Sequence, residues 1–366
     1  MAFINIQRIH CYHFEMPLAH PYFVRAEKID RREGLVVHVI SEHGQMGFGE
    51  ISPLAGVSRE SLRKAGHQAE LLAEELRNAR LPMELPLLLE WFSRRLPADS
   101  ICPSTRFGFE TAILGMVAAL QGKAVCEFLK PGVLREITSA GLLQGSLADV
   151  VRQVRFLDSK GYRTFKLKVG SRNIPLDVQK VDAIRRILPP DARLRLDANR
   201  GWRLDEARMF MEHIGKDRIE YVEEPLADPV QLENFVRLTD APVALDETVQ
   251  EFSLEGMAGR LGITHVVARP MQAGGVAGYL DLLDKAGQLG LNVVLTASFE
   301  SAVGMTVLAN LAALTHTIPN LGTANWFDED LLRRPVVVDA GIIPTDRFLF
   351  DTKFFNTTFL GQLRAV

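Results

Sequence analysis

The sequence predicts an α/β protein with a (β/α) barrel of the TIM type, preceded by an N-terminal α+β layer. Three observations support this prediction. From about residue 138 onward, short apolar stretches alternate with helical stretches. Three of the apolar stretches end in a carboxylate, roughly one βα unit apart. The first 55 or so residues instead alternate apolar and polar positions, which is typical of an antiparallel sheet.

Length and composition agree with this architecture. The chain has 366 residues, whereas a typical barrel takes about 250, so roughly a hundred remain for a second unit. Its hydrophobic content of 47% and charged content of 24% are ordinary for a soluble globular protein. A net charge of −3 gives no electrostatic reason to expect binding to nucleic acid or to an anionic membrane surface.

The sequence also predicts a cytoplasmic location. No apolar run reaches the roughly 18 residues that a membrane span needs. Met1-Ala2-Phe3-Ile4-Asn5 lacks the basic region, apolar core and cleavage site of a signal peptide. The three cysteines, Cys11, Cys102 and Cys126, have neither disulfide-frame nor CxxC spacing, so we expect reduced core thiols.

The N-terminal layer begins with β-hairpins. The alternating stretch 34–40 is followed by a turn at 42–45 and a second alternating stretch at 46–50. A loop at 20–25 is expected between strands, and a second loop at 51–56 follows the sheet.

Helical periodicity starts at Ser58, which is the expected N-cap of the first helix. Apolar residues then mark one helix face as far as Leu76, and two more helices are expected around 85–96 and 104–121.

Eight barrel strands are expected from the strand–loop–helix rhythm. Between two of them, Asp228 is a suitable cap for a helix that starts at Pro229. The irregular C-terminal stretch is expected to return to the N-terminal layer, which gives one unit of residues 1–125 plus about 330–366 and a barrel of residues 126–329. The expected strands are Ser139–Gly145, Thr164–Val169, Arg193–Asp197, Arg218–Glu223, Val243–Asp246, His265–Arg269, Val293–Thr296 and Asn320–Thr323.

Carboxylates at the ends of three successive strands predict a metal site. In such barrels the carboxyl ends of the strands converge on one mouth, which would bring Asp197, Glu223 and Asp246 together. Three uncompensated carboxylates repel one another, and a hard divalent cation relieves this. Ligation by oxygen alone favours Mg²⁺ or Mn²⁺ over zinc. The alternative is that each acid caps a helix or pairs with a surface lysine. Of the adjacent pair, Glu223 or Glu224, only one can face the mouth.

Lys166 and Lys168 lie two residues apart in an apolar strand, so both ammonium groups point to the same side. The like charge and partial burial are expected to lower the pKa of one lysine and make it a usable base. A base opposite a metal suits abstraction of a proton α to a carboxylate. The alternative is a solvated edge strand that discourages edge pairing.

These motifs resemble the enolase superfamily, in its muconate lactonizing enzyme subgroup. The chain contains Lys166-Leu167-Lys168, Asp197-Ala198-Asn199, Glu223-Glu224-Pro225 and Asp246-Glu247-Thr248, which are similar to the KxK, DxN, EEP and DE(S/T) signatures. The resemblance implies a capping domain in the N-terminal layer, a small carboxylate substrate, and Mg²⁺ held by Asp197, Glu223 and Asp246. It also implies that Lys168 is the acid/base and Lys166 its electrostatic neighbour. The resemblance further implies that the loops at 20–25 and 51–56 close the mouth of the site and read substrate shape, as lids do.

Within the subgroup the chain most resembles the o-succinylbenzoate synthase family. The resemblance rests on the segments 47–54, 194–202 and 298–301. It implies dehydration of a hydroxycyclohexadiene carboxylate that carries a succinyl chain, a step of menaquinone synthesis. Lys168 would remove the α-proton to give a metal-stabilised enediolate and then protonate the departing hydroxyl on the same face.

Arg269 departs from the subgroup, which has a lysine at this position. A guanidinium is always protonated near neutral pH and cannot act as a base. It can serve as a cation that stacks on a ring-shaped intermediate. The departure weighs against racemases of acylamino acids and epimerases of dipeptides, which need bases on both faces of the α-carbon. The alternative is that Arg269 only pairs with Asp246 or Glu247.

Further residues are expected to bind the substrate. Gly274 and Gly275 can allow close backbone approach or merely form a turn. Ser298 and Ser301 can bind the succinyl carboxylate or cap the next helix. The remaining candidates come from the segments that carry the resemblance: Arg195, Asn199, Ser52 and Pro53.

His265 is expected to be a core or rim histidine rather than a catalyst. Two alternative functions stay open, a racemase or epimerase of the same superfamily and a barrel that binds a carboxylate without turnover. The oligomeric state is not predicted.

Overall fold

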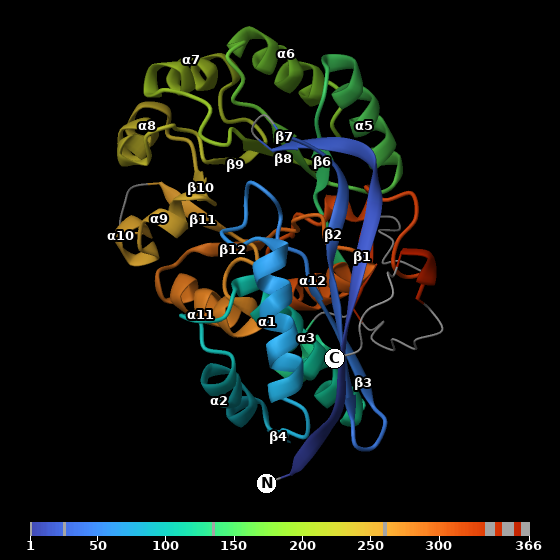
Figure 1. Cartoon of the computed structure of the whole chain (residues 1–366). Coiled ribbons are helices and arrows are strands. Elements are labelled where there is room, and N and C mark those ends of the chain that lie inside the picture. The colour runs from blue at the N-terminus through green and yellow to red at the C-terminus, as the bar shows by residue number, and fades with distance from the viewer. Residues whose placement is uncertain are drawn as a thin grey trace.

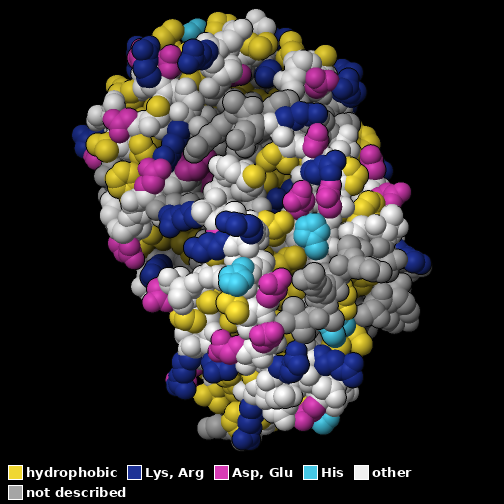
Figure 2. Space-filling model, viewed as in Figure 1, with side chains coloured by type: hydrophobic (Ala, Val, Ile, Leu, Met, Phe, Trp, Pro, Cys, Tyr) yellow, Lys and Arg dark blue, Asp and Glu magenta, His cyan; other side chains and the backbone are white. Residues whose placement is uncertain are grey.

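The computed structural model describes residues 2–24, 27–133, 136–258, 262–333, 341–345 and 355–359. In these residues an antiparallel four-stranded sheet lies beside a curled parallel sheet of seven strands whose helices lie on its outer side (Figure 1). The predicted α/β architecture, a barrel with an N-terminal α+β unit, is therefore confirmed. Blue and magenta side chains are intermixed over the visible face (Figure 2), with no large region of one charge sign.

The N-terminal unit is a hairpin sheet covered by helices. The strand order is β3-β2-β1-β4, and all described neighbours are antiparallel. The strands are β1 (Phe3–Val24), β2 (Glu27–Ser41), β3 (Met46–Ile51) and β4 (Arg80–Pro82), and the helices are α1 (Leu62–Glu75), α2 (Leu85–Arg95) and α3 (Pro103–Leu120).

Two predictions in this unit were wrong. The stretch 20–24 is not a loop, because β1 continues to Val24 and its backbone pairs with β2 there. Aromatic and β-branched residues favour this extended pairing over a loop. The N-cap of α1 is Ser61, which accepts a hydrogen bond from the Lys64 amide. Ser58 instead accepts one from the Leu54 amide, within the turn before the helix.

Helix α3 lies directly against β3. A Cβ added at Gly47 would lie 1.9 Å from the Ala112 carbonyl oxygen, and one added at Gly49 would lie 1.9 Å from that of Gly108. No real side chain tolerates such distances, so these glycines set the separation between sheet and helix. Helix α3 is consequently buried on nearly all sides.

The parallel sheet runs in the order β12-β11-β10-β9-β8-β7-β6, so strands next to each other in sequence are neighbours in space. Its strands are β6 (Gly141–Leu143), β7 (Thr164–Lys168), β8 (Arg193–Asp197), β9 (Ile219–Glu223), β10 (Val243–Leu245), β11 (Ile263–Ala268) and β12 (Asn292–Leu295). The associated helices are α4 (Val125–Leu129), α5 (Leu147–Ser159), α6 (Ile174–Arg185), α7 (Leu204–Ile214), η1 (Pro229–Gln231), α8 (Leu232–Thr239), α9 (Thr248–Glu251), α10 (Leu254–Ala258), α11 (Gly275–Gln288) and α12 (Ala302–Ala312). Asp228 caps η1 as predicted.

The predicted eighth strand is reduced to a single bridge. Asn320 pairs with Thr296 and is then followed by the short helix η2 (Gly322–Asn325). The ring still closes through the backbone, because the Asn320 amide donates to Leu295 (2.8 Å) and the Ala140 amide donates to Pro319 (2.9 Å). Gly322 permits this short connection, since a Cβ there would lie 2.9 Å from the Leu142 amide.

Side chains fill the inside of the barrel. Tyr221, Ala244, Val267 and Val294 form a small buried cluster from four neighbouring strands. The His265 ring lies 4.8 Å from the Tyr221 ring, and burial lowers the pKa of His265 to about 4. We therefore interpret His265 as a neutral core histidine with a structural role, in agreement with the prediction.

Some of the described C-terminal residues pack against the N-terminal sheet, whereas others pair with a strand near the start of the barrel. Leu331, Leu332 and Phe355 pack against Phe14 and Phe48. Strand β13 (Ile342–Pro344) pairs with β5 (Glu136–Thr138), and η4 (Thr357–Phe359) follows. The rest of the predicted C-terminal return lies outside the described residues. The exact domain boundaries stay predictions, and α4 spans the predicted junction at 125–126.

Two further findings concern the whole described chain. No helix among the described residues has the length and apolar character that crossing a membrane requires. All three cysteines are unpaired and buried.

Glu110 joins α3 to α11 across the two units. Its carboxylate accepts hydrogen bonds from the Arg106 guanidinium and from the Ala277 amide, both at 3.0 Å. A Cβ at Gly275 would lie 2.4 Å from this carboxylate, so a residue with a side chain would not fit at this position. Burial raises the pKa of Glu110 to about 7, although Arg106 opposes the shift.

We expect Gly49→Ala to lower the free energy of unfolding by about 2–3 kcal/mol, because the new methyl group forces β3 away from α3. Gly287→Ala is the matched control, since nothing lies within 4 Å of the added methyl group at this exposed helical position. The control should gain about 0.5–1 kcal/mol from reduced backbone freedom. Urea denaturation measures both. Equal stability of the two variants would show that β3 and α3 are not in such close contact.

We expect Glu110 to make stability fall as the pH rises. The pKa of Glu110 is raised on folding, so its contribution to the free energy of unfolding is full below about pH 4.5. This contribution is lost as the pH rises through about 7. Glu110→Gln cannot ionise, so between pH 4.5 and 7.5 its free energy of unfolding should decrease by about 3 kcal/mol less than that of the parent chain. Denaturation curves at several pH values test this, and parallel pH profiles would contradict it.

Candidate active site

The charged residues of the site come from consecutive strands in register. Lys168 at the end of β7 is paired with Asp197 at the end of β8, and Asp197 with Glu223 at the end of β9. Asp246 and Arg269 follow the ends of β10 and β11. Because these strands are parallel, their carboxyl ends lie at one mouth of the barrel. The predicted convergence of these five residues on one end of the barrel is therefore observed.

Lys166 lies between two carboxylates. Its Nζ is 2.9 Å from Asp197 Oδ2 and 2.7 Å from Glu223 Oε1, and its side chain is only 7% exposed. Phe165 and Leu167, on the opposite face of β7, are fully buried. Both faces of the strand are therefore covered, which rules out a solvated edge strand for Lys166.

Lys168 is more accessible than Lys166. Its side chain is 27% exposed, and its Nζ donates to Asp197 Oδ2 and to Asn199 Oδ1, both at 2.6 Å. Asn199 donates in turn to Glu247 Oε1 at 3.1 Å. Lys168 is thus held at the surface of the site by an acid and an amide.

The charged side chains of Lys166, Asp197 and Glu223 shift one another's pKa. Burial alone lowers the pKa of the Lys166 ammonium, but Asp197 and Glu223 outweigh burial and raise it above its ordinary value. Lys166 is therefore not the lysine for which a lowered pKa was expected. Burial alone raises the pKa of Asp197, but Lys166 and Lys168 outweigh it and hold that pKa well below its usual range. Burial, followed by repulsion from Asp197, raises the pKa of Glu223 to about 8.

Of the two adjacent glutamates, Glu223 faces the barrel interior, on the same side as the buried Tyr221. Glu224 turns away and orders the loop after β10. Its carboxylate accepts hydrogen bonds from the amides of Asp246 and Thr248, both at 2.7 Å, and from Arg200 Nε at 3.0 Å. Glu224 therefore orients the backbone that carries Asp246.

Arg269 pairs with Asp246. Its Nη2 lies 2.5 Å from Asp246 Oδ2, and its Nη1 lies 3.3 Å from Ser298 Oγ. Burial lowers the pKa of the guanidinium, but Asp246 outweighs burial and raises it. The pairing that was the alternative prediction is thus present, and Arg269 also lines the cavity described below.

The donor set suits a hard divalent cation. Glu223 Oε2 is buried and has no hydrogen-bond partner among the described residues, and only oxygen donors are available from Asp197, Glu223 and Asp246. No three described His, Cys, Asp or Glu side chains are already grouped around one point as a metal site would require. The reason is visible in the contacts above: Lys166 lies between Asp197 and Glu223, and Arg269 binds Asp246. A metal bound here would take over part of the charge compensation that these cations provide.

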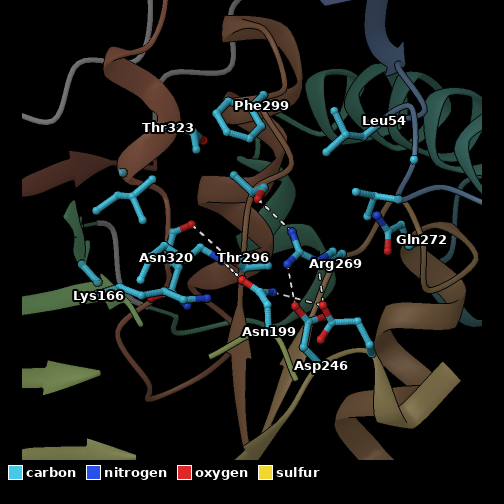
Figure 3. Close-up of a pocket in the computed structure, with 18 of the residues that line it drawn as sticks. Leu54, Lys166, Asn199, Asp246, Arg269, Gln272, Thr296, Phe299, Asn320 and Thr323 are labelled. Carbon is cyan, nitrogen blue, oxygen red and sulfur yellow. Dashed lines mark hydrogen bonds and ion pairs between the residues drawn. The ribbon is translucent and has the colours of Figure 1, made fainter. Parts of the chain in front are cut away.

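A cavity of about 700 Å³ opens above these residues. Figure 3 shows Asn199 and Asp246 on one side, Phe299 and Leu54 on the opposite side, and Arg269 between them. Leu54, Val57 and Arg59 come from the loop after β3, so the N-terminal unit supplies part of the wall. The cavity therefore has a charged floor and a partly apolar opposite wall.

Several residues predicted to bind substrate do not line this cavity. Arg195 is fully buried, where it donates to Glu220 and Asn320. Gly275 packs against Glu110, and Gly274 against Arg106, rather than facing the site. Ser301 caps α12 and donates to Glu50, so the helix-capping alternative holds.

The remaining predicted residues have mixed positions. Asn199 lines the cavity. Ser298 accepts a hydrogen bond from Arg269, which lines the cavity. Ser52 and Pro53 lie just before the cavity-lining Leu54, and their carbonyls accept hydrogen bonds from Arg32.

Sequence reasoning missed other cavity residues. Asn320 and Thr323 follow β12, and Asn320 Nδ2 and Thr323 Oγ1 are buried without a hydrogen-bond partner among the described residues. Phe299 lies within a segment that carries the resemblance, and Glu247 was considered only as part of a motif and as a partner of Arg269, yet both line the cavity. A signal for Thr323 existed, since it ends the last predicted strand, where barrel sites lie.

Two family models match this chain. One, described as enolase C-terminal domain-like, matches residues 149–347. The other, described as MenC, N-terminal domain, matches residues 6–116.

Curated relatives match over most of the chain. The o-succinylbenzoate synthase of Aliivibrio fischeri is 31% identical over 328 residues, which cover 87% of this chain and 91% of the relative. That of Photorhabdus laumondii is 31% identical over 330 residues, which cover 88% of this chain and 92% of the relative.

Solved structures share the fold. The L-Ala-D/L-Glu epimerase from Bacillus subtilis has a TM-score of 0.81 and 22% identity, covering 93% of this chain and 96% of its own. An enolase superfamily member from Roseovarius nubinhibens, complexed with magnesium, has a TM-score of 0.83 and 20% identity, covering 98% of both chains. Identities this low establish similarity of fold alone.

Proposed function

This chain belongs to the enolase superfamily, and we propose that it is a lyase that dehydrates 2-succinyl-6-hydroxy-2,4-cyclohexadiene-1-carboxylate to o-succinylbenzoate in menaquinone biosynthesis. One observation of the site carries the proposal. Lys168, the more accessible of the two lysines that line the cavity, lies in the same cavity as the Arg269 guanidinium, and both side chains contact buried carboxylates. This arrangement provides one base and permanent cations around it. The curated relatives named above support the choice of substrate.

Lys168 would act as base and then as acid. In its neutral form, Nζ accepts the proton from the carbon next to the substrate carboxylate, and the resulting negative charge is shared by the carboxylate oxygens as an enediolate. When the C–O bond breaks, the ammonium returns that proton to the leaving hydroxyl, and water departs. One amine serves both steps, so elimination is syn. Asp197 and Asn199 orient Nζ for both transfers.

Other residues would compensate charge and orient the substrate. Lys166 and Arg269 keep their positive charge, because carboxylates raise the pKa of both. The planar guanidinium of Arg269 is suited to stack against a six-membered ring. Lys166 is a fixed cation that lines the cavity between Asp197 and Glu223, rather than a second base.

The superfamily binds Mg²⁺, and Asp197, Glu223 and Asp246 are the residues that would hold it here, with Mn²⁺ as an alternative ion. When bound, such an ion acts as a Lewis acid that stabilises negative charge on the substrate carboxylate. Glu224 would contribute by fixing the backbone that presents Asp246.

A racemase or epimerase is the alternative within the superfamily. Such a reaction needs a proton acceptor on each face of the α-carbon, and the cavity-lining residue directly after β11 that would have to be the second acceptor is Arg269. The raised pKa of this guanidinium prevents it from accepting a proton near neutral pH. Exchange of the substrate α-proton with deuterated water from both enantiomers of an acylated amino acid would support the alternative.

A barrel that binds a carboxylate without turnover is the alternative of another class. Calorimetric binding of the substrate with no product in a coupled assay would favour it. We further propose that the ligand is a small carboxylate rather than nucleic acid or membrane, and that the protein is cytoplasmic, which the three unpaired cysteines support.

We expect Lys168→Ala to lower kcat for dehydration by at least about 10³-fold, since positioned proton transfer is lost. Formation of the aromatic product is followed by ultraviolet absorbance. Lys180→Ala on the outer helix α6 is the control and should keep full activity. Unfolding and magnesium titrations should show that both variants fold and bind metal. Activity retained in Lys168→Ala would remove this residue from the proposed role.

We expect chelation by EDTA to abolish activity and added Mg²⁺ to restore it. Asp246→Asn should raise the Mg²⁺ concentration for half-maximal activity by at least about tenfold, because one anionic donor is lost. Isothermal titration of the metal-free protein with Mg²⁺ provides the direct measurement. Full activity after exhaustive chelation would contradict the assignment of a metal site.

A further inference from the structure

Arg32 lies on β2 of the N-terminal unit and is almost fully buried, with an exposed fraction of 4%. Its guanidinium donates to three backbone carbonyls. Nη2 lies 2.6 Å from the Ser52 oxygen, Nη1 3.3 Å from that of Pro53, and Nε 3.0 Å from that of Phe299. The first two belong to the loop after β3, and the third belongs to the barrel. One side chain thus ties segments that are about 250 positions apart in sequence.

Both tied segments form cavity wall. Leu54 directly follows Pro53 and lines the cavity, as does Phe299. Figure 3 shows the two side chains on the same side of the cavity, opposite Asn199 and Asp246. Arg32 itself does not line the cavity. It influences the cavity wall through its hydrogen bonds to the backbone of the segments that form the wall.

Phe299 adopts a backbone conformation that needs support. Its φ angle is +62°, which is unfavourable for a bulky residue. Such a conformation costs on the order of 1–3 kcal/mol and persists only when surrounding contacts hold it. Its carbonyl accepts the Arg32 hydrogen bond, and its ring packs edge-on against Trp326 with centroids 5.1 Å apart. These contacts hold the ring at the cavity.

Buried acids keep Arg32 in place. Burial lowers the pKa of Arg32, and the nearby carboxylates of Glu300 and Glu50 oppose that shift. Glu50 also accepts hydrogen bonds from Ser52 Oγ (2.5 Å) and from the Gly304 amide (2.9 Å). The guanidinium therefore belongs to a polar junction between β2, β3 and the start of α12, and its planar fork suits carbonyls that lie in different directions.

We propose that Arg32 is a positioning residue for substrate binding, which holds the loop at Leu54 and the ring of Phe299 together as one wall over the apolar part of the substrate. The identity of that substrate rests on the function proposed above. The role of Arg32 differs from catalysis, because it contacts neither the reacting atoms nor the cavity.

The test compares Arg32→Met and Arg32→Lys with Arg185→Met. Arg185 is the matched control, because it also donates to backbone carbonyls, here those of Ile214, Gly215 and Asp217, but it is remote from the cavity. Arg32→Met should raise KM for the dehydration substrate and Kd for o-succinylbenzoate about tenfold, with kcat changed less than threefold, as expected when hydrogen bonds from a charged donor are lost. Arg32→Lys keeps the charge and should recover part of the affinity. Arg185→Met should leave KM and Kd unchanged.

Two further measurements separate positioning from stability. Trypsin cleavage after the exposed Arg59 should become about tenfold faster in Arg32→Met than in Arg185→Met, well below both melting temperatures. Phe299→Ala should raise KM, and Arg32→Met in that background should raise it further by less than in the parent chain.

The outcomes are distinct. Unchanged KM, Kd and cleavage rate in Arg32→Met, with only a lower melting temperature, overturn the proposal for Arg32 and leave the proposed function intact. If the parent chain does not catalyse the dehydration, the proposed function fails instead. The cleavage comparison with Arg185→Met then decides whether Arg32 holds the loop.

Discussion

The rest of the site depends on one electrostatic constraint, the burial of several carboxylates at the mouth of a closed barrel. Asp197, Glu223 and Asp246 lie at the ends of adjacent strands, and the protein compensates them with Lys166, Lys168 and Arg269. Compensation is incomplete, because the pKa of Glu223 remains raised and one of its oxygens has no hydrogen-bond partner in the part of the chain that the structure describes. A site that is short of positive charge is suited to a divalent cation and to the charge that develops on a carboxylate substrate.

The same constraint gives the two lysines different roles. Lys166 is enclosed by two acids and keeps its proton, whereas Lys168 reaches the cavity and has one acid and one amide as partners. The difference arises because Lys166 lies deeper in the barrel along β7 than Lys168 does. Two residues of a β-strand span about 6–7 Å, so both lysines line the cavity, but Lys168 lies further along the strand toward the mouth and is more exposed.

The N-terminal unit is an integral part of the site rather than a separate layer. Arg32 and Glu50 reach the start of α12, and Glu110 accepts a hydrogen bond from the first turn of α11. Arg32 donates to a backbone carbonyl, whereas Glu50 and Glu110 accept from amides at helix N-termini, where a carboxylate is stabilised by the helix dipole. The cavity wall therefore depends on how the two units dock.

The residues responsible for charge and register could be predicted from the sequence. Strand periodicity put Lys166 and Lys168 on one face, and the strand ends brought Asp197, Glu223 and Asp246 to one mouth. The substrate residues were predicted less well. Arg195 points to the same side of β8 as Asp197 but lies deeper in the barrel, where it is fully buried. Ser301 and Gly275 instead contact Glu50 and Glu110, which belong to the N-terminal unit. No local pattern contains this information.

The sequence by itself determined the barrel, its strand order and the acidic mouth, because period-two alternation and the βα rhythm are local properties of the chain. Only the tertiary structure decided that the eighth strand shrinks to one bridge, that Glu223 rather than Glu224 faces inward, and that Phe299 and Leu54 form the cavity wall. These features depend on ring closure and on the docking of two units. Both are set by packing between residues that are distant in sequence, which periodicity does not encode.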